Sequence, residues 1–118
     1  MHIIRSAIVA LALALAAGAA FAHSKMMQST PANGAAVAAG LSAIKLQFAK
    51  PVRLTLVNIV RADDASEVKS TTPIADAFIE AQEFAVPPLA AGKYDIAWVA
   101  VAKDGHVMKG TISFQVKD

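Results

Sequence analysis

Three side chains in this sequence have the types and spacing to hold a transition-metal ion: His23, Asp104 and His106. Imidazole nitrogens and carboxylate oxygens are common ligands of copper, zinc and nickel. The chain has one other histidine, His2, which lies in an apolar N-terminal stretch. The place where that stretch ends matters, because a histidine that begins a mature chain offers its α-amine and its imidazole to one ion as a chelate.

Residues 1–22 have the features of a secretory signal peptide. Arg5 supplies the positive charge, an apolar run covers residues 8–20, and Ala20-Phe21-Ala22 is a small-x-small cleavage sequence. The run is shorter and richer in alanine than a spanning helix of ~20 residues. We expect cleavage after Ala22, export from the cytoplasm and a mature chain that begins at His23. A retained leader is the alternative, and it would remove the free amine.

The sequence Asp104-Gly105-His106 has two interpretations. Asp-Gly between two strands is a strong hairpin signal, and a turn alone would explain both residues. The same turn can direct a carboxylate and an imidazole toward one ion. If the N-terminal segment lies beside it, the donors are an amine nitrogen, two imidazoles and a carboxylate oxygen. Nitrogen and oxygen donors in a tetragonal arrangement favour one Cu(II) ion, while zinc or nickel stays open on chemistry alone.

Composition excludes several other classes of protein. The 118 residues include no cysteine, which rules out thiolate metal ligands and thiol catalysis. The 11 Lys and Arg residues nearly balance the 9 Asp and Glu residues, which argues against nucleic acid as a partner. Residues 23–118 are enough chain for one domain that folds alone. The hydrophobic fraction of 56% includes the leader and many alanines, and does not indicate a membrane domain.

The elements that must position these residues are strands. Apolar and polar residues alternate in residues 44–48 and 111–117, β-branched and apolar residues dominate 53–61, and a less certain strand covers 78–86. Residues 93–101 are the clearest central strand, with Tyr94, Ile96 and Trp98 on one face. Turn sequences separate these strands, and no helical period appears after the leader. We expect an all-β fold, a single antiparallel β-sandwich or barrel, with no second domain.

Five stretches together resemble the CopC copper-resistance family, in the family's order and over essentially the whole chain after the leader. Each piece alone is weak, but the combination is specific: His23, residues 29–34 (STPANG), residues 89–98 (LAAGKYDIAW), residues 104–106 (DGH) and residues 110–114 (GTISF). The resemblance implies a small periplasmic, immunoglobulin-like or cupredoxin-like Greek-key β-sandwich that binds Cu(II).

The resemblance also implies ligands and partners. Copper would be held by the amine and imidazole of His23, by the imidazole of His106, and by Asp104 as the carboxylate at or near the metal. The family suggests an inner-membrane copper transporter of the CopD type or a multicopper oxidase as partner. Some members have a further histidine where this chain has Lys25, so the donor set should be the smaller one.

Soft ligands are few in this chain. Family members with a separate Cu(I) site carry a methionine-rich loop in mid-chain, but residues 71–89 contain neither methionine nor histidine. We therefore expect no separate methionine-rich site. Met26, Met27 and Met108 are expected to fill gaps in the core, as methionine does well, although a thioether also suits Cu(I). Tyr94 and Trp98 are expected in the core, with Trp98 a reporter for nearby copper.

Three functions are compatible with these candidate residues. The first is a periplasmic carrier or buffer of Cu(II) without catalytic residues, whose affinity falls as pH drops through the range near ~6.5 where histidine imidazoles titrate. The second is a copper enzyme of the polysaccharide monooxygenase kind, which also uses an N-terminal histidine chelate. The third is an immunoglobulin-like interaction module without metal. No hydrolytic triad or glycine-rich phosphate loop is visible.

Overall fold

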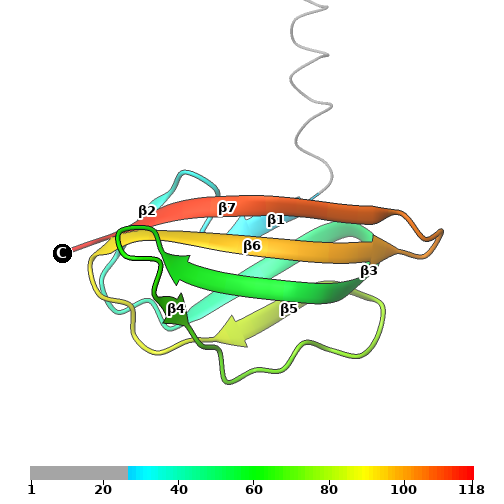
Figure 1. Ribbon diagram of the computed structural model, residues 1–118, viewed down its shortest axis with the longest axis horizontal. Helices are drawn as coiled ribbons and strands as arrows, with labels where there is room; N and C mark the ends of the chain where they lie inside the picture. The colour runs from blue at the N-terminus through cyan, green and yellow to red at the C-terminus, as the bar shows by residue number, and fades with distance from the viewer. Residues whose placement is uncertain (1–26) are drawn as a thin grey trace, which may run out of the picture.

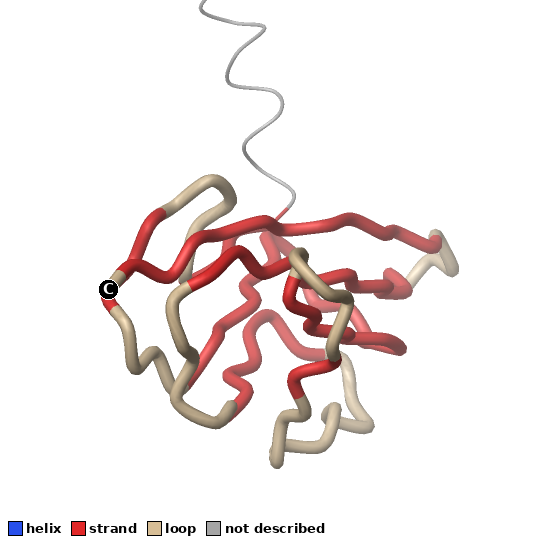
Figure 2. The backbone as a smooth tube through the Cα atoms, turned by 60° about the vertical axis from the view of Figure 1, so that its left-hand side comes forward, coloured by secondary structure: helices blue, strands red, loops and turns tan. Residues whose placement is uncertain are grey.

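The computed structural model describes residues 27–118, and every regular element in that part of the chain is a strand (Figures 1 and 2). The expectation of an all-β fold is therefore confirmed. His23 and the expected cleavage site lie outside the described residues. The strands are β1 (Met27–Thr30), β2 (Ala36–Ala38), β3 (Ala43–Arg61), β4 (Glu67–Val68), β5 (Ile79–Ala85), β6 (Gly92–Ala102) and β7 (Val107–Lys117).

Strand β3 organises the sheet because it changes partners along its length. Residues 43–48 pair with β5 and β1, whereas residues 52–61 pair with β6 and β4, and Val52 also pairs with Ile79 of β5. The register shifts between Gln47 and Val52, where Pro51 has no N–H to donate to a ladder. The prediction of two strands, 44–48 and 53–61, was wrong in one respect, since the two form a single strand that continues through the proline.

The sheet is mixed rather than purely antiparallel. Its order is β1-β3-β6-β7-β2, with β4 and β5 both paired to β3. Strand β2 runs parallel to the end of β7, which corrects the antiparallel expectation. The physical reason lies just before β2, where the loop bonds to β7: the Gly34 N–H donates to the Ser113 carbonyl (2.6 Å) and Asn33 Oδ1 accepts from the Ser113 N–H (2.9 Å). The Greek-key connection stays a prediction.

The other predicted strands are confirmed with small changes. Residues 78–86 correspond to β5 and residues 93–101 to β6. The strand expected over 111–117 begins four residues earlier, because the ladder between β6 and β7 runs as far as the pair Val101 and Val107. Strands β1, β2 and β4 were not predicted. Each is only two to four residues long, too short to show a clear alternating pattern.

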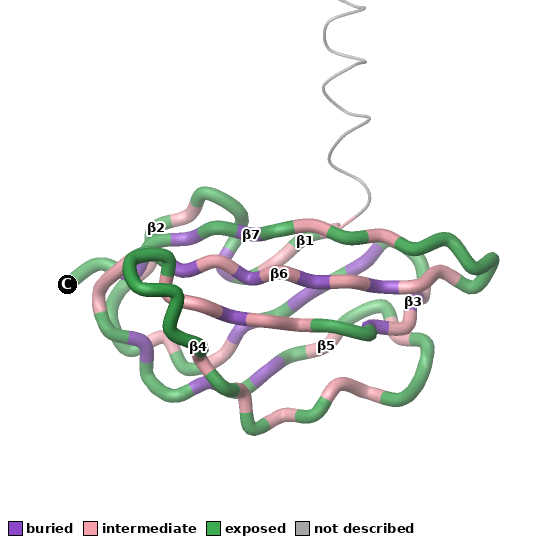
Figure 3. The backbone as a smooth tube through the Cα atoms, in the orientation of Figure 1, coloured by how far each residue is buried: buried purple, intermediate pink, exposed green. Residues whose placement is uncertain are grey.

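Alternation along the strands builds one core between the faces of the curled sheet. Figure 3 shows buried residues alternating with partly buried ones along β6, and the second half of β7 alternates buried with exposed residues. Tyr94, Ile96 and Trp98 are 2%, 0% and 8% exposed, as expected for a shared inward face. Partly buried Met27 and Met108 pack against this core, which confirms the packing role expected for them. Within residues 27–118, no helix is long and apolar enough to cross a membrane.

Candidate metal site

Asp104 and His106 lie in the turn that joins β6 to β7, at the far right of the hairpin in Figure 1. The Ala102 N–H donates to the His106 carbonyl (2.8 Å), and the Ala102 carbonyl accepts from the Gly105 N–H (3.0 Å). Gly105 has φ of 91°, a left-handed conformation that glycine adopts without steric cost. The hairpin expected at Asp104-Gly105 is confirmed, with a three-residue loop of Lys103, Asp104 and Gly105.

This turn brings the carboxylate and the imidazole together. Asp104 Oδ1 accepts a hydrogen bond from the His106 backbone N–H at 3.0 Å, and Asp104 Oδ2 lies 2.8 Å from His106 Nδ1. Both side chains are exposed, 64% for Asp104 and 81% for His106. The turn predicted at Asp104-Gly105 therefore brings the two side chains into contact, and their role as metal ligands stays a prediction.

The contact favours the ionised form of the Asp104 carboxyl group. The pKa of Asp104 is lowered from its ordinary value, chiefly by the hydrogen bond from the His106 backbone N–H and next by the contact with the His106 side chain. The carboxylate is thus ionised at neutral pH and accepts a hydrogen bond from Nδ1. In the neutral imidazole the other nitrogen, Nε2, then carries the free lone pair that binds a metal.

A hollow opens beside this pair. Its volume is about 490 Å³ and its wall is mostly apolar, with Asp104, His106 and Lys50 as its charged or titratable members. The other lining residues are Phe48, Ala49, Val52, Ala102, Val107 and Met108. No feature of the sequence was used to predict this hollow. The signal that could have revealed it is the pair Ala100 and Ala102, small residues at two successive inward positions at the end of β6.

The described chain begins next to this hollow. Met27, the first residue of β1, pairs with Phe48 of β3, and Phe48 lines the hollow. Because β1 and β3 are antiparallel, the chain enters β1 from the side on which β3 continues to Ala49 and Lys50, two further lining residues. The segment that leads to His23 thus joins the fold at the end of the molecule that carries Asp104 and His106.

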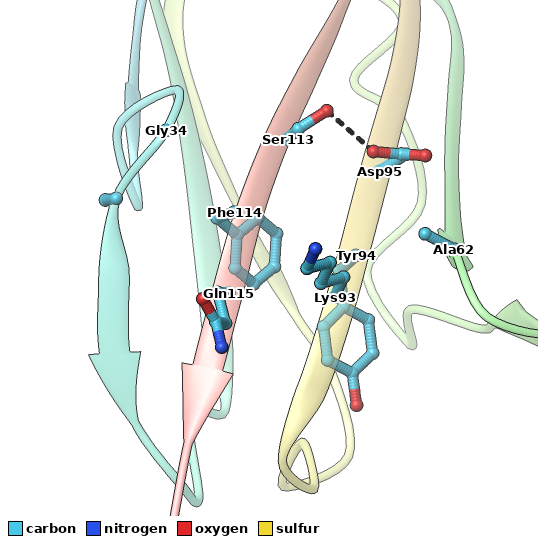
Figure 4. A pocket seen from close by; sticks show the side chains of 9 residues that line it. Gly34, Ala62, Lys93, Tyr94, Asp95, Ser113, Phe114 and Gln115 are labelled. Carbon is cyan, nitrogen blue, oxygen red and sulfur yellow. Dashed lines mark hydrogen bonds between the residues drawn. The ribbon is translucent and has the colours of Figure 1, made fainter.

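Within residues 27–118, no group of three or more His, Asp or Glu side chains is arranged to hold a metal. A second hollow, shown in Figure 4, lies over the opposite end of β6 and β7 near Gly34 and Ala62. There Ser113 Oγ donates to Asp95 Oδ1 at 2.6 Å, and no histidine lines the wall. Among the described residues, Asp104 and His106 are therefore the candidate ligand pair.

Several residues in the stretches 89–98 and 110–114, which resemble the family, are explained by packing and hydrogen bonding. The Tyr94 hydroxyl donates to the Ala90 carbonyl (2.7 Å) and accepts from Arg61 Nη1 (2.9 Å). Gly92 leaves room for that guanidinium, since a Cβ there would lie 2.6 Å from Arg61 Nη2. Likewise, a Cβ on Gly110 would lie 2.9 Å from the Trp98 ring. These residues shape the sandwich, which leaves residues 104–106 as the part of the pattern available for metal chemistry.

The fold and the site define an all-β domain with an exposed carboxylate–imidazole pair on one hairpin. A family model described as the CopC domain matches residues 26–117, which is most of the chain. The protein therefore belongs to the CopC family, and the resemblance found in the sequence is confirmed.

Individual relatives agree with this assignment. The chain is 31% identical to copper resistance protein C of Xanthomonas campestris pv. juglandis, over 97% of this chain and 95% of that one. It is similar to the crystal structure of CopC from Methylosinus trichosporium OB3b, with a TM-score of 0.64, 25% identity and coverage of 80% and 94%. It also resembles PcoC, a methionine-rich copper resistance protein from Escherichia coli, with a TM-score of 0.59, 30% identity and coverage of 79% and 97%.

Proposed function

We propose that this protein is a periplasmic Cu(II) carrier or buffer that acts in copper homeostasis and resistance without catalytic turnover. Membership of the CopC family and relatives named for copper resistance support this function. In the proposal, residues 1–22 are a signal peptide removed after Ala22, and residues 23–118 form the copper-binding domain. One Cu(II) ion is bound by His23, His106 and Asp104.

The observation that carries the proposal is the contact between Asp104 Oδ2 and His106 Nδ1 at 2.8 Å. It presents Nε2 of an exposed imidazole as a preformed ligand. Carboxylate–imidazole pairs of this kind fix the tautomer and orientation of metal-binding histidines. In this arrangement His106 binds copper through Nε2. Asp104 would hold the ring from its Nδ1 side and add a negative charge near the site, as the carboxylate at or near the metal.

His23 supplies the remaining donors in this proposal. Four residues of extended chain span about 13 Å, and Met27 is four residues after His23. Met27 pairs with Phe48, which lines the same hollow as His106, and this placement supports an approach of His23 to His106. Two nitrogens from His23, one from His106 and the nearby Asp104 oxygen give the nitrogen-rich tetragonal set that favours Cu(II).

The experiment that tests the ligand set compares electron paramagnetic resonance spectra of Cu(II) bound to two forms. One form begins at His23 and the other carries a single additional alanine before it. A tetragonal, nitrogen-rich signal that changes on extension is expected, because the extension removes the free amine from His23. Identical spectra would contradict coordination by the amine.

A second comparison tests copper binding itself. The double variant His23→Ala/His106→Ala is expected to lose most of the Cu(II) affinity of the processed protein, because it removes both imidazoles. Equal affinities would contradict the copper function as proposed. The recipient of the copper is proposed from the family resemblance alone, as an inner-membrane transporter of the CopD type or a multicopper oxidase.

A further inference from the structure

The hollow beside His106 lies at the end of β6, where the inward side chains are small. The inward positions of β6 are filled by Tyr94, Ile96 and Trp98, but at its end they are Ala100 and Ala102. On β7 the residue opposite Ala100 is Met108. Met108 is half-buried, packs against the core and lines the hollow together with His106. A thioether therefore borders the same space as the candidate copper ligand.

His106 and Met108 belong to one face of the hairpin. Side chains alternate along β7, and Ile112, Phe114 and Val116 are the buried ones. Counting back from Ile112 in steps of two, Gly110 and Met108 lie on the same face of the strand. The hydrogen bond from the Ala102 N–H to the His106 carbonyl extends the ladder to His106, two residues before Met108. His106 and Met108 thus both line the hollow from one face of the hairpin, with the imidazole exposed and the Met108 side chain half-buried.

The chemistry of this pair differs from that of the Cu(II) site. Thioether sulfur is a soft ligand that selects Cu(I), and imidazole binds both oxidation states of copper. The wall around Met108 is formed mainly by apolar side chains, including Phe48 and Val52, which offer no oxygen ligands for a harder ion. Met27 also packs against the core, but it does not line this hollow.

We propose that Met108 Sδ and His106 Nε2 bind Cu(I) in this hollow. The site shares His106 with the proposed Cu(II) function and rests on it for that residue alone. It differs from a methionine-rich loop, because it uses one thioether on the metal-binding hairpin. One imidazole thereby serves both oxidation states, with the oxygen and amine donors on its outer side and the sulfur on its inner side.

The test is a competition for Cu(I) between the protein and a chromophoric chelator under anaerobic conditions. Met108→Leu nearly conserves the side-chain volume, so the fold should be kept. We expect it to lower the Cu(I) affinity by about tenfold or more, the scale on which lost partners weaken metal sites. Met27→Leu is the matched control and should leave the Cu(I) affinity unchanged. Equal Cu(I) affinities of Met108→Leu and the unaltered protein would overturn the proposal.

X-ray absorption at the copper edge gives a readout that needs no variant. The Cu(I) form of the unaltered protein should show a sulfur neighbour, and its absence would overturn the proposal even if Met108→Leu failed to fold. The Cu(II) resonance spectrum of Met108→Leu should be unchanged. If lengthening the chain before His23 leaves Cu(II) unaffected while the Cu–S signal is present, only the amine ligand fails and the Cu(I) site stands.

Discussion

At the scale of single residues, Asp104 makes two separate contributions to the site. Its Oδ1 accepts from the backbone N–H of His106, which fixes the turn, and its Oδ2 lies 2.8 Å from Nδ1, which fixes the ring. Because the pKa of Asp104 is lowered, the folded state gains stability from this contact above the ordinary pKa of aspartate. That gain is lost as pH falls through the lowered value.

The lowered pKa predicts how many protons copper displaces. At pH 8 the Asp104 carboxylate is already ionised, so it releases no proton when Cu(II) binds. We expect Asp104→Asn to weaken Cu(II) binding by about 10–100-fold, as for other partners of metal-bound histidines. The number of protons released, measured by titration calorimetry in two buffers, should equal that of the unaltered protein. One proton fewer in the variant would contradict an ionised Asp104.

At the scale of elements, the hairpin of β6 and β7 carries both the core and the site. Alternation in residues 93–101 predicted the inward face correctly, because a two-residue period survives wherever one face is buried. The long strand β3 was harder to predict from sequence, since Pro51 interrupts the pattern while the chain continues and changes partners. The parallel pairing of β2 depends on bonds between Asn33, Gly34 and Ser113, which lie about eighty residues apart.

Gly110 is predicted to be a packing position. A Cβ there would lie 2.9 Å from Trp98 Cζ2 and Nε1, and the ring is only 8% exposed. Gly110→Ala should therefore lower the free energy of unfolding by about 1–3 kcal/mol, the usual cost of overpacking. Urea denaturation measures it, with the exposed neighbour Lys109→Ala as a control expected within about 0.5 kcal/mol of the unaltered protein. Equal stability of the two variants would show that Trp98 moves aside without cost.

A substitution of Tyr94 should change the stability of the domain and leave its copper affinity unchanged. Its hydroxyl makes two hydrogen bonds at the end of β6 remote from the metal pair, to the Ala90 carbonyl and from Arg61. Tyr94→Phe should lower the free energy of unfolding by about 1–2 kcal/mol. Its Cu(II) affinity should stay as it was, because no ligand changes. A parallel loss of affinity in the folded variant would mean that this end of the sandwich influences the site.

At the scale of the whole molecule, local sequence predicts the proximity of Asp104 and His106 but not the position of His23. Asp104 and His106 are two residues apart, so a turn is enough to predict that they meet. His23 is eighty residues before them, and its role was predicted from the cleavage sequence. The structure adds a reason for the two to converge, since β1 begins opposite Phe48 beside the hollow. The hollow itself needed the fold, because its wall comes from three separate strands and a turn.

Copper binding should stabilise the whole domain, and Trp98 can report both binding and unfolding. A ligand that binds only the folded state raises the free energy of unfolding by about 2.7 kcal/mol at a free concentration of 100 times its dissociation constant. Trp98 is the one tryptophan in the sequence, and its ring contacts Phe48 with centroids 5.4 Å apart. Because Phe48 lines the hollow beside His106, we expect Cu(II) bound at His106 to quench the indole fluorescence.

We therefore expect saturating Cu(II) to reduce Trp98 fluorescence and to raise the urea midpoint of the form that begins at His23. His106→Ala is the control, since it removes the ligand from an exposed position and leaves the core intact. It should show neither quenching nor stabilisation at the same copper concentration. Quenching that persisted in this variant would place copper elsewhere on the molecule. Stabilisation without quenching would instead mean that the ion binds at the outer face of the hairpin, away from Phe48.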